Sequence, residues 1–181
     1  MRPFVIGFIG WSGAGKTTLA ARVVAELARM GFRCAALKDA HHGFDMDRPG
    51  KDSWRYREAG AGEVIVRSDE RWAMLVETPS GREPVEALLA NFSSVNDIIV
   101  VEGFKHEGRY PKIEVRRREN LDGRPPSPLH DDVAAIAADD PSLAAPGLPL
   151  LDINDERAVA EFILTLKTRA ALQSEQDTLE A

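Results

Sequence analysis

The chain is short of cysteine, of long apolar runs and of positive charge. Its one cysteine, Cys34, lies in an apolar stretch, so an intrachain disulfide and a zinc site built on several cysteines are excluded. No apolar run approaches the roughly 18 residues that a membrane-spanning helix needs. The first three residues lead directly into an apolar run, which leaves no space for a signal peptide. We therefore expect a cytoplasmic protein with no membrane segment.

The charge balance is acidic, with 29 Asp and Glu against 23 Lys and Arg and a net charge of −6. Broad nucleic-acid binding needs a basic surface, so this balance argues against DNA or RNA as a partner. Hydrophobic residues make up 44% of the chain and charged residues 29%, as is ordinary for a soluble globular protein. Local clusters of basic residues remain available for small anionic ligands.

The stretch around which the chain is organised is residues 10–18, GWSGAGKTT. It fits G-x-x-x-x-G-K-[ST], the Walker A or phosphate-binding loop (P-loop) of nucleoside triphosphatases. The apolar run at residues 4–9 predicts a buried strand before it, and apolar residues at helical spacing predict a helix after it that ends near Gly31. Strand, loop and helix in this order are the context that the motif requires.

The chemistry of phosphate binding explains these residue types. Glycines let the backbone turn tightly, so that successive N–H groups point at phosphate oxygens, and the following helix presents its positive end to the same anion. Lys16 is expected to reach the β- and γ-phosphates, and the Thr17 hydroxyl to ligate Mg²⁺. The predicted nucleotide-binding residues are Gly10, Ser12, Gly13, Ala14, Gly15, Lys16, Thr17 and Thr18.

Strands alternate with helices along the rest of the chain. Apolar runs predict strands at residues 32–37, 97–103, 112–117, 133–137 and 150–151, a hairpin at 64–66 and 72–77, and helices between them. This order predicts an α/β protein with the three-layer P-loop NTPase fold and a mostly parallel central sheet. We expect one nucleotide-binding domain at residues 1–168 and a polar C-terminal tail at residues 169–181.

Ligands of such folds bind beyond the carboxyl ends of the strands, where Lys38, Glu102 and Asp139 are expected to meet the P-loop. Glu102 is placed to assist Thr17 in holding Mg²⁺, although a strand-terminal acid in solvent is the alternative. Asp39 could polarise a water or bind Mg²⁺, and a solvated loop acid is an equal alternative.

Asp139 raises the question of base preference. A carboxylate just past a strand can accept hydrogen bonds from N1–H and the 2-amino group of guanine, which adenine lacks. The usual N-K-x-D guanine motif is absent, because Ala137 and Ala138 replace its Asn and Lys. Preference for GTP over ATP therefore stays a hypothesis at this stage.

A long segment without periodicity, residues 39–52, is expected to be a functional loop. His41, His42, Asp45 and Asp47 suggest a metal site, but their spacing matches no regular zinc pattern. The basic residues nearby favour a second anionic ligand, and a solvated polar loop is the alternative. The candidate residues for a positive pocket are Lys38, His41, His42, Arg48, Lys51, Arg55, Lys105, His106, Lys112 and the run 116–118.

Taken in order, the motifs resemble the molybdopterin-guanine dinucleotide biosynthesis protein B (MobB) family. After the P-loop, the resemblance is carried by KDAHHGFDMDRPGKDSWRYREAGA at residues 38–61, RWAMLVETP at 71–79, VVEGFKHE at 100–107, PKIEVRR at 111–117 and LLDIND at 150–155. It covers nearly the whole chain up to about residue 166. The string His-His-x-x-Asp-x-Asp-x-Pro-Gly-Lys-Asp-Ser is its most specific part.

The resemblance implies a GTP-binding P-loop protein, usually a homodimer, with weak Mg²⁺-dependent GTPase activity. It also implies a supporting role beside a partner, the molybdenum cofactor guanylyltransferase, which converts molybdopterin to its guanine dinucleotide, and it makes molybdopterin a candidate ligand. The one departure is Asp39, where the family often has a non-acidic residue. Family motif residues fall on His41, His42, Asp45, Asp47, Lys51, Asp52, Ser53, Arg55, Glu102, Gly103, Lys105, Lys112 and Arg117.

Three functions follow from these observations. The first is a GTP-binding accessory protein with slow hydrolysis, in which Lys16, Thr17 and Glu102 carry the chemistry. The second is a small-molecule kinase that uses His41, Asp39 or Glu102 as the base toward a hydroxyl acceptor. The third is an interaction module whose nucleotide is structural. In the first, a phosphorylated pterin is expected to lie against the basic surface near Lys51, Arg55, Lys105 and Lys112.

Overall fold

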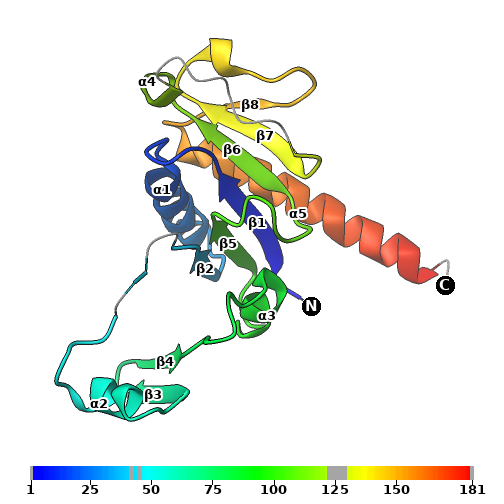
Figure 1. Cartoon of the computed structure of the whole chain (residues 1–181). Helices are drawn as coiled ribbons and strands as arrows, with labels where there is room; N and C mark the ends of the chain where they lie inside the picture. Colours follow the sequence, from blue (N-terminus) through cyan, green and yellow to red (C-terminus); the bar gives the residue numbers. More distant parts are fainter. Residues whose placement is uncertain (1, 41–42, 45, 122–129, 180–181) are drawn as a thin grey trace. The chain divides into compact units, whose positions relative to one another are not determined.

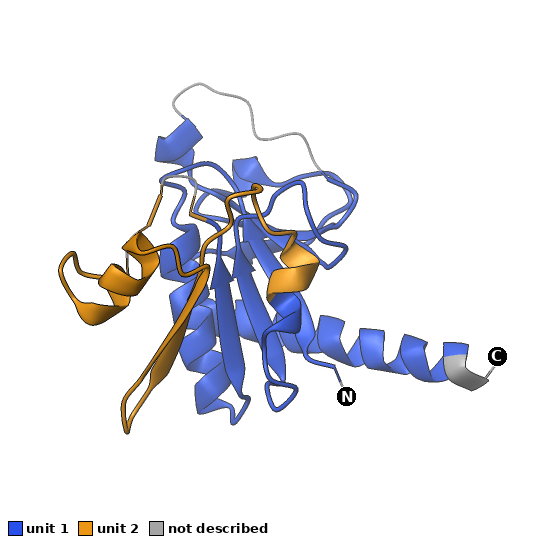
Figure 2. Cartoon of the chain, turned by 60° about the horizontal axis from the view of Figure 1, so that its bottom comes forward, with its two compact units in different colours: residues 1–39, 89–181 blue, residues 40–88 orange. Residues whose placement is uncertain are grey.

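The computed structural model describes residues 2–40, 43–44, 46–121 and 130–179. They form two compact units, which are coloured blue and orange in Figure 2. The first unit comprises Met1–Asp39 with Leu89–Ala181, and the second comprises Ala40–Leu88. The P-loop belongs to the first unit, and most of the long loop after β2 belongs to the second.

The first unit is built on a six-stranded sheet in the order β2-β5-β1-β6-β7-β8, in which all the pairings are parallel. The expected α/β fold with a mostly parallel central sheet is therefore confirmed. Continuous apolarity correctly predicts a central strand at β5, because β5 pairs with β2 on one side and β1 on the other. The strands are β1 (Phe4–Ile9), β2 (Cys34–Lys38), β5 (Ile98–Glu102), β6 (Lys112–Arg116), β7 (Val133–Ala138) and β8 (Leu150–Asp152).

Helices α1 (Lys16–Arg29) and α5 (Glu156–Leu179) pack side by side against one face of this sheet (Figure 1). Leu19, Val23 and Leu27 recur at helical spacing and are buried among the inward-facing strand residues, as are Val159 and Ile163 of α5. This apolar layer fixes α1 beneath the P-loop, so the start of the helix lies at the carboxyl end of β1.

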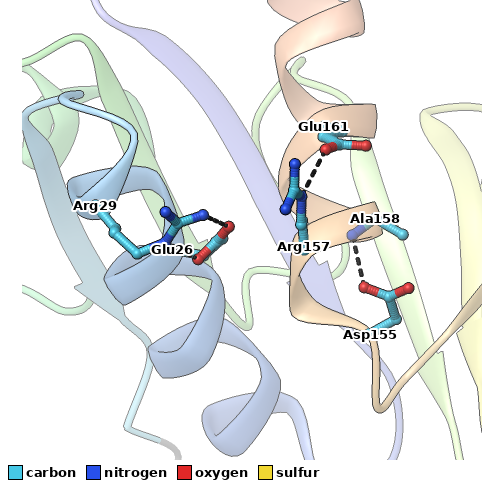
Figure 3. A network of polar contacts seen from close by, with 6 residues as sticks. All are labelled: Glu26, Arg29, Asp155, Arg157, Ala158 and Glu161. Carbon is cyan, nitrogen blue, oxygen red and sulfur yellow. Dashed lines mark hydrogen bonds and ion pairs between the residues drawn. The ribbon is translucent and has the colours of Figure 1, made fainter.

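Each of these two helices carries an ion pair of its own (Figure 3). Arg29 donates to Glu26 at 2.6 and 2.8 Å, and Arg157 donates to Glu161 at 3.0 Å. The hydrogen bond from Arg29 holds the pKa of Glu26 below its usual value, and the charge of Arg157 on the other helix acts in the same direction. Both pairs are solvent-exposed, so apolar burial stabilises the helix pair more than they do.

The other face of the sheet carries the loop between β5 and β6. This loop crosses β1 at Gly7, where a Cβ atom would lie 2.8 Å from Lys112 Cγ and 3.0 Å from the Tyr110 ring. Strand β6 is buried on both faces, with Lys112, Glu114 and Arg116 all at most 5% exposed. The alternation of charged and apolar residues in β6 thus marks two buried faces.

Arg116 makes two hydrogen bonds inside the protein, to Glu114 Oε2 at 2.9 Å and to the Leu143 carbonyl at 2.7 Å, while its Nε has no partner among the described residues. The last residues of β6 lead into the short helix α4 (Arg118–Leu121), and β7 leads into the short 3₁₀ helix η1 (Pro141–Leu143). Leu121 and Leu143 belong to a second apolar cluster with Ile9. These elements close the second face of the sheet near the P-loop.

The second unit contains α2 (Asp52–Glu58) and an antiparallel hairpin of β3 (Glu63–Arg67) and β4 (Trp72–Val76). Arg57 ties them together, because it donates to Glu77 at 2.6 Å and contacts Asp47 at 3.3 Å. The hairpin leaves an unusual number of large apolar side chains in solvent. They are Ile65, Val66, Trp72, Met74 and Val76, each between 41% and 67% exposed. Helix α3 (Val85–Ala90) follows and spans the boundary between the two units.

The C-terminal segment continues as helix. The sequence predicts a polar tail from residue 169, whereas α5 runs without a break to Leu179. The residues beyond Ala170 are polar but form helix readily, and the helix is already nucleated by the packed turns around Val159 and Ile163. None of the helices in the described part of the chain is long and apolar enough to cross a bilayer.

Candidate functional site

The P-loop joins the carboxyl end of β1 to the start of α1. Gly10, Gly13 and Gly15 have φ angles of 135°, 81° and 91°, in the region that side chains rarely adopt. A Cβ atom at Gly10 would also overlap the carbonyl oxygen of Val115 on the neighbouring strand. Gly15 is the N-cap of α1 and makes no side-chain cap hydrogen bond. The first N–H groups of α1 therefore face the loop, as an anion-binding site requires.

Lys16 folds back over the loop that precedes it. Its Nζ donates to the carbonyl oxygens of Gly10 at 3.0 Å and Trp11 at 2.8 Å. Partial burial lowers the pKa of Lys16, which the negative charge of Glu102 opposes and the positive charge of Lys38 reinforces. The lysine is thus an incompletely solvated cation beside the cradle of N–H groups, and a phosphate would stabilise its charged form.

Thr17 and Glu102 meet, as the predicted metal site requires. Thr17 Oγ1 donates to Glu102 Oε1 at 2.7 Å, although 85 residues separate them in the sequence. Lys38 joins them from the end of β2, with Nζ 2.6 Å from Glu102 Oε1 and 3.0 Å from Thr17 Oγ1. A hydroxyl and a carboxylate are the hard oxygen ligands that Mg²⁺ prefers. The donor set fits Mg²⁺, and the ammonium group of Lys38 lies between the two proposed ligands.

Asp39 lies beside this cluster. Its backbone N–H donates to the Glu102 carbonyl at 2.9 Å, and a Cβ atom at Gly103 would lie 2.7 Å from its own Cβ. Gly103 has a φ angle of 92° and lets the two chain segments approach this closely. Asp39 is therefore packed at the carboxyl edge of the sheet next to the metal-type pair.

Two further side chains lie beside the P-loop: Arg117, which the sequence places among the candidate basic residues, and Asn120, which sequence reasoning missed. Arg117 follows β6, and its guanidinium lies 3.4 Å from the position of a Cβ atom at Gly15. Asn120 Oδ1 lies 2.7 Å from the corresponding position at Gly13. Within the described residues, the buried Nε of Arg117 has no hydrogen-bond partner. No motif in the sequence singled out Asn120, whereas Arg117 stands in the basic run 116–118.

Asp139 occupies the end of β7, as expected, but contacts the chain itself. Its Oδ1 accepts a hydrogen bond from the Arg118 backbone N–H at 2.9 Å. The next residue, Asp140, pairs with the guanidinium of Arg118. The two carboxylates therefore hold the turn between β6 and α4 in place, next to Arg117.

The residues of the predicted positive pocket belong to different units. Lys51 and Arg55 are exposed in the second unit, whereas Lys105 and Lys112 belong to the first. Lys112 is not a surface cation, because it is 1% exposed, pairs with Asp132 and donates to the Gly108 carbonyl at 3.0 Å. Lys105 lies over the ring of Trp11 in the P-loop, with Nζ 5.5 Å from its centroid. His41, His42 and Asp45 lie outside the described residues.

Of the four candidate metal ligands at the long loop, only Asp47 lies within the described residues. Asp47 accepts hydrogen bonds from Ser53 at 2.7 Å and from Arg57 at 3.3 Å. In the described part of the chain, no three or more His, Cys, Asp or Glu side chains are grouped as a metal site would need.

Comparison with known proteins identifies the family of this chain. A model of the family Molybdopterin guanine dinucleotide synthesis protein B (MobB) matches residues 5–139. The molybdopterin-guanine dinucleotide biosynthesis adapter protein of Escherichia coli strain K12 is 41% identical over 163 residues, which are 88% of this chain and 91% of that protein. The adapter protein of Haemophilus influenzae is 40% identical over 162 residues, 88% of this chain and 86% of its own length.

Solved structures agree with the sequence comparison. A crystal structure of molybdopterin-guanine biosynthesis protein B has a TM-score of 0.67 at 25% identity and covers 90% of this chain and 99% of its own. Bacillus subtilis MobB has the same fold, with a TM-score of 0.67 at 23% identity over 89% of this chain and 96% of its own. The expected resemblance is confirmed, and the chain belongs to the MobB family.

Proposed function

We propose that this chain binds GTP with Mg²⁺ at the P-loop, hydrolyses it slowly, and serves as an adapter in the biosynthesis of molybdopterin guanine dinucleotide. The observation that carries the nucleotide part is the contact between Thr17 and Glu102 at 2.7 Å, beside the glycine loop and Lys16. Family membership supports the pathway. The relatives from Escherichia coli and Haemophilus influenzae bear the name of adapter proteins of that pathway.

The positions of the P-loop residues and their neighbours support a role for each in binding the nucleotide and Mg²⁺. The N–H groups of the loop and of the first turn of α1 bind phosphate oxygens, and Lys16 turns from its own loop carbonyls toward the β- and γ-phosphates. Thr17 and Glu102 hold Mg²⁺, which neutralises charge on the phosphates when it is bound. Arg117, which lies against Gly15, supplies a second cation on the other side of the loop. Asp139 is the candidate residue for recognising guanine, by accepting hydrogen bonds from the base.

The same proposal includes a homodimer and the guanylyltransferase as partner. The exposed apolar side chains of the β3–β4 hairpin support an interface on the second unit, because a monomer leaves few such side chains in solvent. Sedimentation at several protein concentrations tests the dimer. A hairpin variant, Trp72→Glu, should shift the protein toward the monomer, while Arg71→Glu at the adjacent exposed position serves as the matched control.

Calorimetric titration of GTP and ATP with Mg²⁺ tests nucleotide binding. Lys16→Ala should weaken GTP binding about tenfold or more, since a cation is removed from the phosphates. Lys167→Ala, a substitution of the same type on α5, should leave it unchanged. Equal affinity of the wild-type and Lys16→Ala proteins would refute the proposed site.

The fate of labelled γ-phosphate distinguishes hydrolysis from the kinase reaction. Under the proposal, the label appears in free phosphate, and it does so slowly. Label in an organic product after incubation with cell metabolites would establish the kinase instead. Maturation of the molybdenum cofactor that survives the Lys16→Ala substitution unchanged would favour an interaction module with a structural nucleotide.

A further inference from the structure

The first unit contains a second cleft, of about 670 Å³, where the loop between β5 and β6 meets the start of β7. The loop side supplies Lys105, His106, Arg109 and Tyr110, and the β7 side supplies residues 130–134. This volume is in the range of pockets that hold small ligands. Strands β6 and β7 begin at this cleft, and none of the residues of the P-loop lines it, so the cleft is distinct from the phosphate cradle.

A buried ion pair lies at the cleft. Lys112 is 1% exposed, its Nζ contacts Asp132 Oδ2, and it lies 4.7 Å from the centroid of the Tyr110 ring. The loop is held over this lysine because Lys112 also donates to the Gly108 carbonyl at 3.0 Å. The pair fixes the Asp132 carboxylate in one orientation, because Lys112 contacts only its Oδ2 atom.

Two polar atoms of this cleft are buried without a partner among the described residues. They are Asp132 Oδ1, an acceptor, and His130 Nε2. Both residues line the cleft. Buried polar atoms without a partner destabilise the folded protein, and they are explained where a ligand, an ion or a water completes their hydrogen bonds. An N–H donor is what the carboxylate oxygen requires.

The remaining lining favours a flat, anionic ligand. The rings of His106 and His130 meet edge to face, with centroids 4.9 Å apart and planes at 74°. Together with the Tyr110 ring they give the cleft aromatic walls, on which planar heterocycles stack. Lys105 and Arg109 add two cations, and Lys105 also touches Trp11 of the P-loop.

We propose that this cleft binds the 2-amino-4-oxopyrimidine edge that pterins and guanine share, in a ligand that also carries an anionic group. The ring N–H or the 2-amino group donates to Asp132 Oδ1, His130 Nε2 bonds to the same edge, and Lys105 and Arg109 pair with the anion. The inference rests on the proposed function and deepens it, since it gives the pterin a site different from the expected group of Lys51, Arg55, Lys105 and Lys112.

Fluorescence titration of the full-length protein with pterin-6-carboxylate tests the cleft. In a second experiment, GMP is added as a competitor of the bound pterin-6-carboxylate. His130→Ala and Asp132→Asn should each weaken binding of pterin-6-carboxylate about tenfold or more, because a buried hydrogen bond is lost. Asp131→Asn removes the same charge from the adjacent residue and should change it less than twofold. Lys105→Met, at the end of the loop, should weaken binding without disturbing the buried ion pair.

Thermal unfolding shows which variants are folded. If Asp132→Asn is unstable, Lys105→Met and His130→Ala still test the cleft, because both leave the Lys112–Asp132 pair intact. Displacement of pterin-6-carboxylate by GMP supports the shared edge with guanine as an occupant, and failure to displace it supports the pterin alone. The cleft proposal is overturned if the wild type binds neither pterin-6-carboxylate nor GMP. It is also overturned if the cleft variants bind pterin-6-carboxylate as tightly as the wild type does. Retained GTP binding in that case leaves the proposed function standing. If Lys16→Ala binds GTP as tightly as the wild type does, the proposed function is refuted and the cleft proposal is not.

Discussion

The ammonium group of Lys38 lies 2.6 Å from Glu102 Oε1, at the ends of two adjacent parallel strands. It also lies 3.0 Å from the Thr17 hydroxyl, so it contacts both proposed magnesium ligands. A lysine and a divalent cation cannot occupy the same position, because each is positive and each uses the same oxygen atoms. Lys38 therefore holds the two side chains together, and under the proposed function it has to move before a metal can bind there.

This relationship predicts that Lys38→Met binds a divalent cation more tightly than the wild type does in the absence of nucleotide. Lys38 is half exposed, so the ion pair that the metal must displace contributes only modestly. We expect a gain of about two- to fivefold. Electron paramagnetic resonance of Mn²⁺ titrated into the protein measures free metal directly. Lys105→Met, which removes a cation outside this cluster, is the control, and weaker Mn²⁺ binding by Lys38→Met would contradict the competition.

Gly10 is expected to tolerate no side chain. Gly10→Ala places a Cβ atom against the Val115 carbonyl at a φ of 135°, and should lower the free energy of unfolding by about 3 kcal/mol or more. Gly31→Ala separates the two causes, because Gly31 has a φ of 92° with nothing within 4 Å of its Cβ position. It should cost about 1 kcal/mol. Urea unfolding of both variants measures the difference, and equal costs would show that the contact with Val115 is unimportant.

Arg117 is expected to contribute to nucleotide affinity, on the proposed function. Arg117→Met should weaken GTP binding about tenfold, because a guanidinium that lies against Gly15 is within reach of the bound nucleotide. Arg118→Met is the matched variant one residue later, and its guanidinium pairs with Asp140 instead. Calorimetry on both should show a loss for Arg117 alone. A similar loss in both would point to disturbance of the β6–α4 turn.

The pair of Arg118 and Asp140 predicts a pH dependence of stability. The hydrogen bond from Arg118, with those from Ser142, lowers the pKa of Asp140 from 3.8 to about 2. The folded state therefore favours the charged carboxylate, so its stabilisation is complete above the unfolded pKa of 3.8 and is lost as the pH falls through about 2. Melting temperatures of wild type and Asp140→Asn should differ most above about pH 5 and converge toward pH 2. A difference that persists unchanged at pH 2 would exclude this origin.

The sequence by itself determined the strand, loop and helix from Phe4 to Arg29, because glycine spacing and apolar periodicity are local properties. It also predicted that Lys38 and Glu102 would lie at the edge of the sheet that carries Thr17, since the carboxyl ends of parallel strands share one edge. The family followed from ordered motifs. Sequence patterns were sufficient for those features of the structure that depend on residues close together along the chain.

Only the tertiary structure decided which charges meet. Lys112 looks like a surface cation in the sequence, and it is buried because the β5–β6 loop crosses β1 at Gly7 and covers it. Arg117 lies against Gly15 because α1 begins beside the carboxyl end of β6, a distance in space that no pattern within β6 encodes. The unpartnered oxygen of Asp132 is likewise a product of packing. Burial and pairing depend on segments far apart in the chain, and these come together only when the sheet forms.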